Sequence, residues 1–265
     1  MKILITNDDG VHSSGIIEFA RGLQKNHEVF MVAPRTEQSG ISQAITFLRP
    51  MFPIELRRNA DSDSHIPGYS LDGTPTDCVK LGLFELCPFK PDLVISGING
   101  GLNAGTNVGY SGTVAGAMAG AMFGYPAISI SLESGQPMNF RGAVEVAVPL
   151  IEQLMMDPWP DKVVLNVNLP RQALDGPVQV KSVPVETNPL GYSFEQGKDP
   201  KGRPFFWASN KPGPKPSQHE TDCSELKAGH ITVSPITFNM NATEFVDAVA
   251  SHLDSNSKTP ESRVS

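Results

Sequence analysis

Two adjacent carboxylates, Asp8 and Asp9, follow the apolar run Ile3–Ile5 and precede Gly10. This pattern predicts a buried strand that ends in a turn carrying both acids. In open α/β sheets, ligands bind beyond the carboxyl ends of the strands. Neighbouring carboxylates repel each other, so a cation between them would stabilise such a turn. The pair therefore indicates a metal site; the alternative is that one of the acids only caps the next helix.

Two further turns carry oxygen ligands at equivalent places. Ser39 follows the second predicted strand, and Asn99 follows the third. Serine and asparagine in turns usually bond only to the backbone, but here each comes just after a strand, as Asp8 and Asp9 do. Carboxylate, hydroxyl and amide oxygens are the ligands expected for one Mg²⁺ or Mn²⁺ ion rather than for zinc. The four residues are our candidate metal set, and Ser39 or Asn99 could contact a phosphate instead.

A possible phosphate site follows the glycine-rich passage 97–112. Ser111, Gly112 and Thr113 open a helix made of small residues. Free backbone N–H groups and the positive end of the helix dipole can hold a phosphate there. The alternative is a simple serine cap with small residues for close packing. His12 could shuttle a proton beside the acidic turn, although histidines in loops are more often solvated.

Composition excludes several classes of protein. The 265 residues are 39% hydrophobic and 18% charged, which is typical of a globular chain with a sizeable core. A net charge of −7 argues against general binding of nucleic-acid duplexes. We find no Gly-x-Gly-x-x-Gly after a strand, no Walker lysine motif and no Gly-x-Ser-x-Gly elbow. An anionic ligand would therefore need a metal or a helix N-terminus.

The cellular compartment is suggested by cysteines and by the absence of targeting segments. Cys78, Cys87 and Cys223 are odd in number and lack C-x-x-C spacing, which favours a reducing compartment and argues against zinc. The first residues do not form a signal peptide, and the small-residue run 114–123 is too short to cross a bilayer. We expect a soluble, cytoplasmic protein that does not bind membranes.

Strands and helices alternate through the first 170 residues. Strands are expected at 2–6, 29–33, 93–95, 127–130 and 163–167, with helical patterns between them, and residues 43–72 look β-like but irregular. Thr74 and Pro75 start one of the helices, with Asp77 in its first turn. Repeated β-α units predict an α/β fold with three layers: a mostly parallel, Rossmann-like sheet flanked by helices.

The second half of the chain changes character. Pro, Gly and aromatic residues interrupt short β-like runs over 171–216, which we interpret as a β-rich extension of a single domain, 1–253, whose core is about 1–170. Residues 217–253 return with a helix at 223–227, a strand at 231–233 and a helix at 242–253, and the polar tail 254–265 is expected to be disordered. Phe205, Phe206 and Trp207 could stack on a base, but burial within the extension or against another copy is favoured.

Taken together, these segments resemble the SurE survival-protein family of metal-dependent 5′/3′-nucleotidases. The matching segments run through most of the chain in family order: 3–10, 33–40, 73–79, 91–99, Gly105 with 111–114, 166–170, 221–222 and 229–235. The resemblance implies a divalent metal bound by Asp8, Asp9, Ser39 and Asn99, and a phosphate beside Ser111–Thr113. It also implies a homodimer or homotetramer with exchanged C-terminal elements.

One loop departs from the family pattern. Residues 13–15 read Ser-Ser-Gly where the family often has Ala-Pro-Gly. The difference bears on the shape of the loop beside the site and not on the metal set.

The function expected from these residues and this resemblance is hydrolysis of nucleoside 5′- and 3′-monophosphates, with short polyphosphate as a further candidate substrate. Asp8 and Asp9 would hold the metal, and one of them could orient or deprotonate the attacking water. A phosphorylated receiver domain is an alternative, but it needs an acceptor at the end of a later strand, and Asp92 begins its strand. A non-catalytic nucleotide-binding protein is the third possibility.

Overall fold

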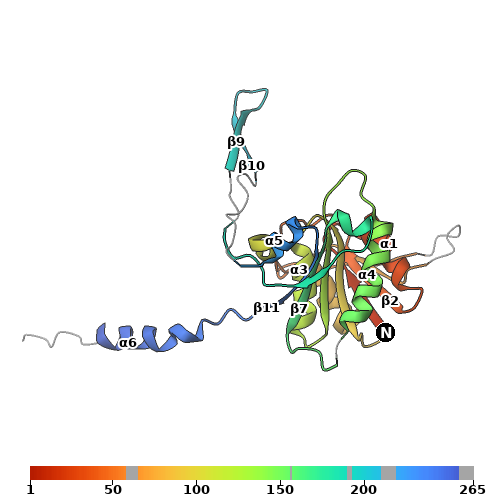
Figure 1. Cartoon of the computed structure of the whole chain (residues 1–265), viewed down its shortest axis with the longest axis horizontal. Helices are drawn as coiled ribbons and strands as arrows, with labels where there is room; N and C mark the ends of the chain where they lie inside the picture. The colour runs from red at the N-terminus through yellow and green to blue at the C-terminus, as the bar shows by residue number, and fades with distance from the viewer. Residues whose placement is uncertain (58–64, 156, 190–192, 210–218, 257–265) are drawn as a thin grey trace, which may run out of the picture.

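The computed structural model describes residues 1–57, 65–155, 157–189, 193–209 and 219–256. Its centre is a nine-stranded sheet in the order β3-β4-β2-β1-β5-β6-β7-β11-β8 (Figure 1). The parallel core strands are β1 (Lys2–Thr6), β2 (Glu28–Pro34), β4 (Gly68–Leu71), β5 (Leu93–Gly100), β6 (Ala127–Leu132) and β7 (Val163–Leu169). At the edges, β3 (Ile54–Glu55) runs antiparallel to β4, and β11 (Ile231–Thr237) runs antiparallel to β7 and parallel to β8 (Val180–Ser182).

Helices cover both faces of this sheet. One face carries α1 (Ser14–Leu23) and α4 (Phe140–Leu154); the other carries α2 (Pro75–Leu81), its π-helical continuation η1 (Gly82–Leu86) and α3 (Gly112–Met122). Along β1, Ile3 and Ile5 pack in the cluster of α1 and α4, whereas Leu4 packs in the cluster of α2. A strand buried on both faces is apolar throughout, which explains the unbroken run at the start of the chain. The predicted three-layer, mostly parallel fold is confirmed.

Local sequence signals explain how two of the helices begin and pack. Thr74 and Asp77 form a reciprocal capping box at the start of α2, with Pro75 as its first residue, as the sequence predicts. The small residues of α3 allow its close approach to β5: a Cβ at Gly116 would lie 2.8 Å from Ser96 Oγ, and one at Gly120 would lie 2.7 Å from Val94 Cβ. Close packing is therefore one real function of this small-residue run.

Some elements differ from the expected ones. Of the irregular segment 43–72, the described residues form only β3 and β4. The loop at Ala44 and Thr46 bonds instead to Thr74 and Asp77 at the start of α2. The last helix, α6 (Val246–Asn256), follows the short 3₁₀ turn η4 (Thr243–Phe245) and continues into the first residues of the expected tail; residues 257–265 lie outside the described part. None of the described helices is long and apolar enough to cross a membrane.

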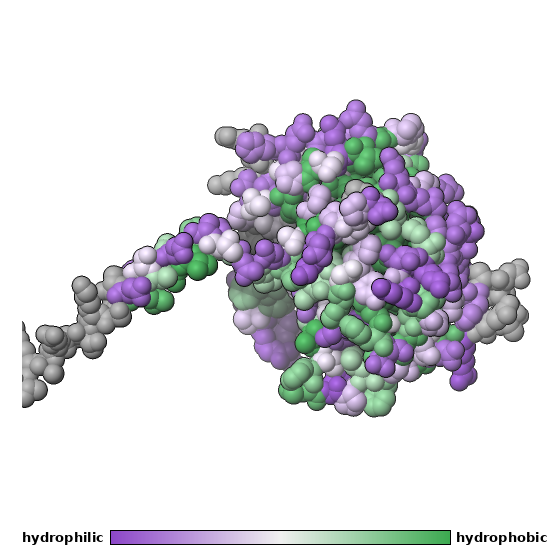
Figure 2. All heavy atoms as spheres, turned by 90° about the horizontal axis from the view of Figure 1, so that it is seen from below, coloured by the Kyte–Doolittle hydropathy of each residue, from purple (hydrophilic) through white to green (hydrophobic). Residues whose placement is uncertain are grey.

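Two elements stand away from the body in Figure 1. Strands β9 (Ser193–Lys198) and β10 (Pro204–Ser209) form an antiparallel hairpin, and α6 extends from the end of β11. Trp207 on the hairpin is 71% exposed. Along α6, Val246, Val249 and Leu253 are exposed at helical spacing, and Figure 2 shows apolar side chains along one side of this arm. Between these two elements, α5 (Asp222–Lys227) and β11 return to the body.

Candidate active site

A cavity of about 310 Å³ lies beyond the carboxyl ends of β1, β2 and β5. The four predicted metal ligands and Ser111 all line it, so the structure brings together residues from four separate segments. Asn99 was expected after the third strand but lies inside it, because β5 continues to Gly100. The other residues that line it are Glu37, Gly40, Gly100, Leu102, Asn103, Asn107 and Tyr110. A site at this sheet edge is what the topology of parallel strands predicts.

Asp8 is the deepest group of the site, with only 4% of its surface exposed. Its Oδ1 accepts a hydrogen bond of 2.6 Å from Thr113 Oγ1, and its backbone carbonyl accepts one of 2.7 Å from the N–H of Gln38. Burial raises the pKa of the Asp8 carboxyl above its usual value, although the hydrogen bonds from Thr113 oppose this shift. The Thr113 bond therefore fixes the orientation of the Asp8 carboxylate, while burial disfavours its charged form.

Asp9 is more accessible and less firmly bonded. Its Oδ2 accepts a long hydrogen bond of 3.4 Å from the N–H of Gly100. Burial raises the pKa of Asp9 to about 6, with smaller contributions from the charges of Asp8 and Glu37. None of the ion pairs among the described residues includes either of the two acids. Their mutual repulsion is thus uncompensated within this part of the chain.

The acidic turn itself is fixed by Asn7. Its side-chain nitrogen donates to the carbonyl of Gly10 at 3.0 Å and to Ser13 Oγ at 2.8 Å. Ser13 thus stabilises the loop at the point where the sequence departs from the family pattern. Gly15 follows at the start of α1, where a Cβ would lie 2.2 Å from the carbonyl oxygen of Ile98, so only glycine allows this close approach.

Ser39 and Asn99 reach the cavity with part of their hydrogen-bonding capacity already used. Ser39 Oγ donates to Glu37 Oε1 at 2.8 Å, which leaves the lone pairs of the hydroxyl oxygen as the ligating sites. Asn99 Nδ2 donates to the carbonyl of Gly101 at 2.7 Å, which leaves the amide oxygen as the ligand atom. Both side chains can therefore offer oxygen to a cation.

The start of α3 is directed at Asp8. Ser111 caps this helix by accepting a bond of 3.1 Å from the N–H of Val114, and Ser111 also lines the cavity. Thr113 donates its hydroxyl hydrogen bond to Asp8. A Cβ on Gly112 would lie 2.8 Å from Asp8 Cβ, so glycine lets the helix approach this carboxylate. That Gly112 and Thr113 contact phosphate stays a prediction; their observed contacts are with a predicted metal ligand.

The charge of the cavity limits what it can bind. Its described lining includes three carboxylates, Asp8, Asp9 and Glu37, and no Lys, Arg or His. A phosphate would be repelled there unless a cation were bound first. No group of three His, Cys, Asp or Glu that could hold a metal exists among the described residues, so a metal would need the hydroxyl and amide oxygens as well. The donors present, all hard oxygens, fit Mg²⁺ or Mn²⁺.

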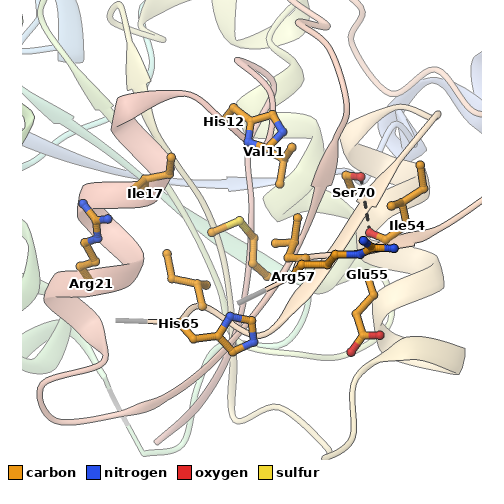
Figure 3. Close-up of a pocket in the computed structure, with 12 residues that line it drawn as sticks. Val11, His12, Ile17, Arg21, Ile54, Glu55, Arg57, His65 and Ser70 are labelled. Carbon is orange, nitrogen blue, oxygen red and sulfur yellow. Dashed lines mark hydrogen bonds between the residues drawn. The ribbon is translucent and has the colours of Figure 1, made fainter. Parts of the chain in front are cut away.

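His12 lines a different cavity. This second cavity, of about 360 Å³, lies beside α1 and the β3–β4 edge, and Figure 3 shows His12, Arg21 and His65 on separate sides of it. His12 is not among the residues that line the acidic cavity. A proton-shuttle role for His12 in the acidic site therefore has no support in this arrangement.

Asp92 lies at the opposite end of the sheet from the acidic turn. It precedes β5, and its Oδ2 accepts a hydrogen bond of 2.7 Å from the N–H of Lys2, the first residue of β1. A receiver domain needs its acceptor carboxylate at the end where Asp8 and Asp9 lie. The receiver alternative is therefore not supported.

Sequence reasoning missed two parts of the site. Glu37 lines the cavity and contributes the third carboxylate. Its position two residues before Ser39, in the same turn, could have indicated that it lies at the site. Asn103 also lines it and is held from below by Asn166 and Asn168 of β7, whose side-chain nitrogens donate to its carbonyl at 2.8 and 3.0 Å. No short-range pattern indicates this long-range contact.

Comparisons with known proteins identify the family of this chain. The sequence model of the family described as "Survival protein SurE" matches residues 3–189. A protein from Rhodopirellula baltica named 5′-nucleotidase SurE is 40% identical over 247 residues, covering 93% of this chain and 96% of its own. A protein of the same name from Syntrophobacter fumaroxidans is 36% identical over 249 residues, covering 94% and 98%.

A solved structure shares the fold. The crystal structure of the SurE protein from Aquifex aeolicus superposes with a TM-score of 0.80 at 31% sequence identity, covering 96% of this chain and all of its own. The sequence match spans both the acidic turn at Asp8 and the helix start at Ser111. The chain belongs to the survival protein SurE family.

Proposed function

We propose that this chain is a metal-dependent phosphomonoesterase that hydrolyses nucleoside 5′-monophosphates to nucleoside and phosphate. Three relatives named 5′-nucleotidase SurE match this chain over nearly their full length. Their name supports nucleoside 5′-monophosphates as the substrate class. The observation that carries the metal dependence is the acidic cavity, in which Asp8, Asp9 and Glu37 face an anionic substrate without a cationic side chain in the described lining.

The proposed metal set is Asp8, Asp9, Ser39 and Asn99, holding one Mg²⁺ or Mn²⁺ ion. When bound, the ion supplies positive charge for the phosphoryl oxygens and lowers the pKa of water. Asp8 is the fixed ligand, because Thr113 orients it. Asp9 is our candidate to orient or deprotonate the attacking water, because it is less buried and its hydrogen bond from Gly100 is long.

The substrate phosphate would lie between the diacid and the start of α3. Ser111 and Asn99 are the proposed direct contacts, since both line the cavity. Gly112 and Thr113 would support the same end of the site through the positive end of the helix and through Asp8. All these contacts address the phosphoryl group, which 5′- and 3′-monophosphates share, so we propose activity on both. We propose short polyphosphate as a further substrate for the same reason, because it also presents a terminal phosphoryl group.

We also propose that the chain works as a homodimer or homotetramer. The hairpin β9–β10 and helix α6 stand away from the body (Figure 1). The hairpin exposes aromatic side chains, and α6 exposes an apolar face (Figure 2). A two-stranded hairpin is marginally stable alone, and exposed apolar surface of this kind is typical of an interface.

The experiment that tests the function is release of inorganic phosphate by the full-length chain. A panel of 5′- and 3′-nucleoside monophosphates and tripolyphosphate is assayed with Mg²⁺, with Mn²⁺ and without added metal. We expect hydrolysis of the 5′-monophosphates with either metal. Binding of nucleotide without phosphate release would instead support a non-catalytic nucleotide-binding protein.

A further inference from the structure

One wall of the acidic cavity is the connection between β5 and α3, residues 101–111. It supplies five residues to the lining, Leu102, Asn103, Asn107, Tyr110 and Ser111. It includes the 3₁₀ turn η2 (Gly105–Gly109). We call residues 101–111 the substrate wall. A connection of this kind needs hydrogen bonds from other segments to hold one conformation, because most of it lies outside the strand and the helix that it joins.

The two ends of the substrate wall are held by two other segments, strand β7 and the loop at Ser42. Near its start, the backbone of Asn103 bonds to Asn166 and Asn168 of β7. Near its end, Ser42 donates from its hydroxyl to the carbonyl of Gly109 at 2.8 Å, and its N–H donates to the carbonyl of Tyr110 at 3.0 Å. The middle of the wall begins at Gly105, and a different part of the chain holds it.

Gly105 is held by Asp222, the first residue of α5. The Gly105 N–H donates to Asp222 Oδ2 at 2.8 Å, while Oδ1 accepts from the N–H of Glu186 at 2.8 Å and of Cys223 at 2.7 Å. The side chain is fully buried, and none of the ion pairs among the described residues includes it. A buried carboxylate without a cation depends on such N–H donors. Asp222 thus joins three segments through one group.

The fit around Gly105 is close on its other side as well. Its φ is +57°, and a Cβ there would lie 3.0 Å from Cys223 Sγ. Any other residue would meet both backbone strain and this sulfur. The wall is therefore set at one position against the C-terminal return, and Asp222 lies outside the residues 3–189 that match the family sequence model.

We propose that Asp222 is a positioning residue for the substrate: it holds Gly105, and through η2 it sets Asn107 and Tyr110 at the cavity. The inference rests on the proposed function. It predicts that loss of the Asp222 bond weakens substrate and phosphate binding. Metal binding should be unaffected, because Asp222 acts on Gly105 and the four candidate metal ligands lie outside residues 101–111.

The test compares Asp222→Asn with wild type in the full-length enzyme. The amide NH₂ would face a backbone N–H in place of one carboxylate oxygen, so at least one bond is lost. We expect KM for adenosine 5′-monophosphate and the inhibition constant of inorganic phosphate to rise by about tenfold or more. We expect kcat to change less, and the Mn²⁺ affinity of the free protein to stay unchanged.

Thr221→Val is the matched control. Thr221 caps the same helix α5 by accepting from the N–H of Ser224, but the hydrogen bonds to the wall come from its neighbour. It should lower the melting temperature and leave KM and phosphate inhibition at wild-type values. If both variants lose the same melting temperature and show the same rise in KM, the effect of Asp222 is only structural, and the inference is overturned.

A second variant covers the case in which Asp222→Asn does not fold. Gly105→Ala pushes the same wall away from Cys223 and should raise KM and the phosphate inhibition constant in the same way. Wild-type values in a folded Gly105→Ala enzyme would overturn the inference. Wild-type activity is measured first: an inactive wild type overturns the proposed function and the inference with it, whereas an active wild type with unaffected variants overturns the inference alone.

Discussion

Thr113 donates its hydroxyl hydrogen bond to Asp8 over 2.6 Å, across 105 positions of sequence. The first turn of α3 is therefore joined directly to the deepest carboxylate of the site. A helix N-terminus favours negative charge, so this contact helps to keep a buried Asp8 ionised. The helix start and the proposed metal site form one structural unit.

Removal of this hydroxyl should weaken metal binding. A buried hydrogen bond to a charged group contributes about 1.5–3 kcal/mol, so Thr113→Ala should lower Mn²⁺ affinity roughly tenfold to a hundredfold. Calorimetric titration of the free protein measures this. Thr113→Ser keeps the hydroxyl and should bind Mn²⁺ nearly as wild type does. Equal affinity of the alanine variant and wild type would mean that the bond does not support the metal site.

Gly112 should tolerate no side chain. A Cβ there would lie 2.8 Å from Asp8 Cβ and 3.0 Å from the carbonyl oxygen of Gln38, so Gly112→Ala displaces Asp8 or the helix. We expect lower activity on every phosphomonoester together with weaker Mn²⁺ binding. Gly176→Ala is the control, because no atom lies within 4 Å of a Cβ at that position. A fully active Gly112→Ala enzyme would show that the first turn of α3 can shift to make room for the side chain without affecting the site.

The metal-free protein should lose stability as the pH rises. The pKa of Asp9 is raised to about 6 by burial first and by the charge of Asp8 second, with Glu37 adding to it. A raised carboxyl pKa means that the folded state binds the proton more tightly, so stability from this group is complete below the unfolded value of 3.8 and is lost as pH rises through about 6.

Thermal unfolding in chelator measures this effect. The melting temperature should fall between about pH 5 and about pH 7.5, and the fall should be smaller in Asp9→Asn, which has no charge to bury. Added Mn²⁺ should raise the melting temperature most at the higher pH. An identical pH dependence in Asp9→Asn and wild type would contradict the assigned cause.

The exposed aromatic residues of the hairpin should lie in an interface. Phe206 and Trp207 are neighbours on β10 and so point to opposite faces, and both are exposed. Light scattering should show a dimer or larger species at micromolar concentration, and Phe206→Ser with Trp207→Ser should shift it toward monomer. Lys201→Ser in the turn of the hairpin should not. A wild-type protein that stays monomeric would contradict the proposed assembly.

The sequence predicts the position of the acidic site because its signals are local. The apolar run before Asp8 marks a buried strand, and parallel topology then brings Ser39 and Asn99 to the same edge. The hydrogen bonds of the site could not be predicted in this way. Those of Asp222 and Asn168 join segments more than sixty residues apart, and each residue type alone is common in turns.

The sequence was also less informative at the edges of the sheet. The antiparallel pairing of β11 with β7 depends on how the C-terminal return folds back, and the apolar pattern of 231–233 fits either direction. Helix α3 uses its glycines in two ways. Gly116 and Gly120 allow close packing on β5, and Gly112 allows the close approach to Asp8. Spacing along one helix does not contain that information.

The central claim is that the acidic turn holds a divalent metal on which catalysis depends. The most direct measurement is phosphate release from adenosine 5′-monophosphate by wild type and Asp9→Asn, in excess EDTA and after Mn²⁺ is restored, with Mn²⁺ binding titrated on the same samples. We predict no activity in EDTA, recovery with Mn²⁺ in wild type, and in Asp9→Asn weak Mn²⁺ binding with turnover lower by at least about a hundredfold. Full activity in EDTA, or a near-normal Asp9→Asn enzyme, would contradict it.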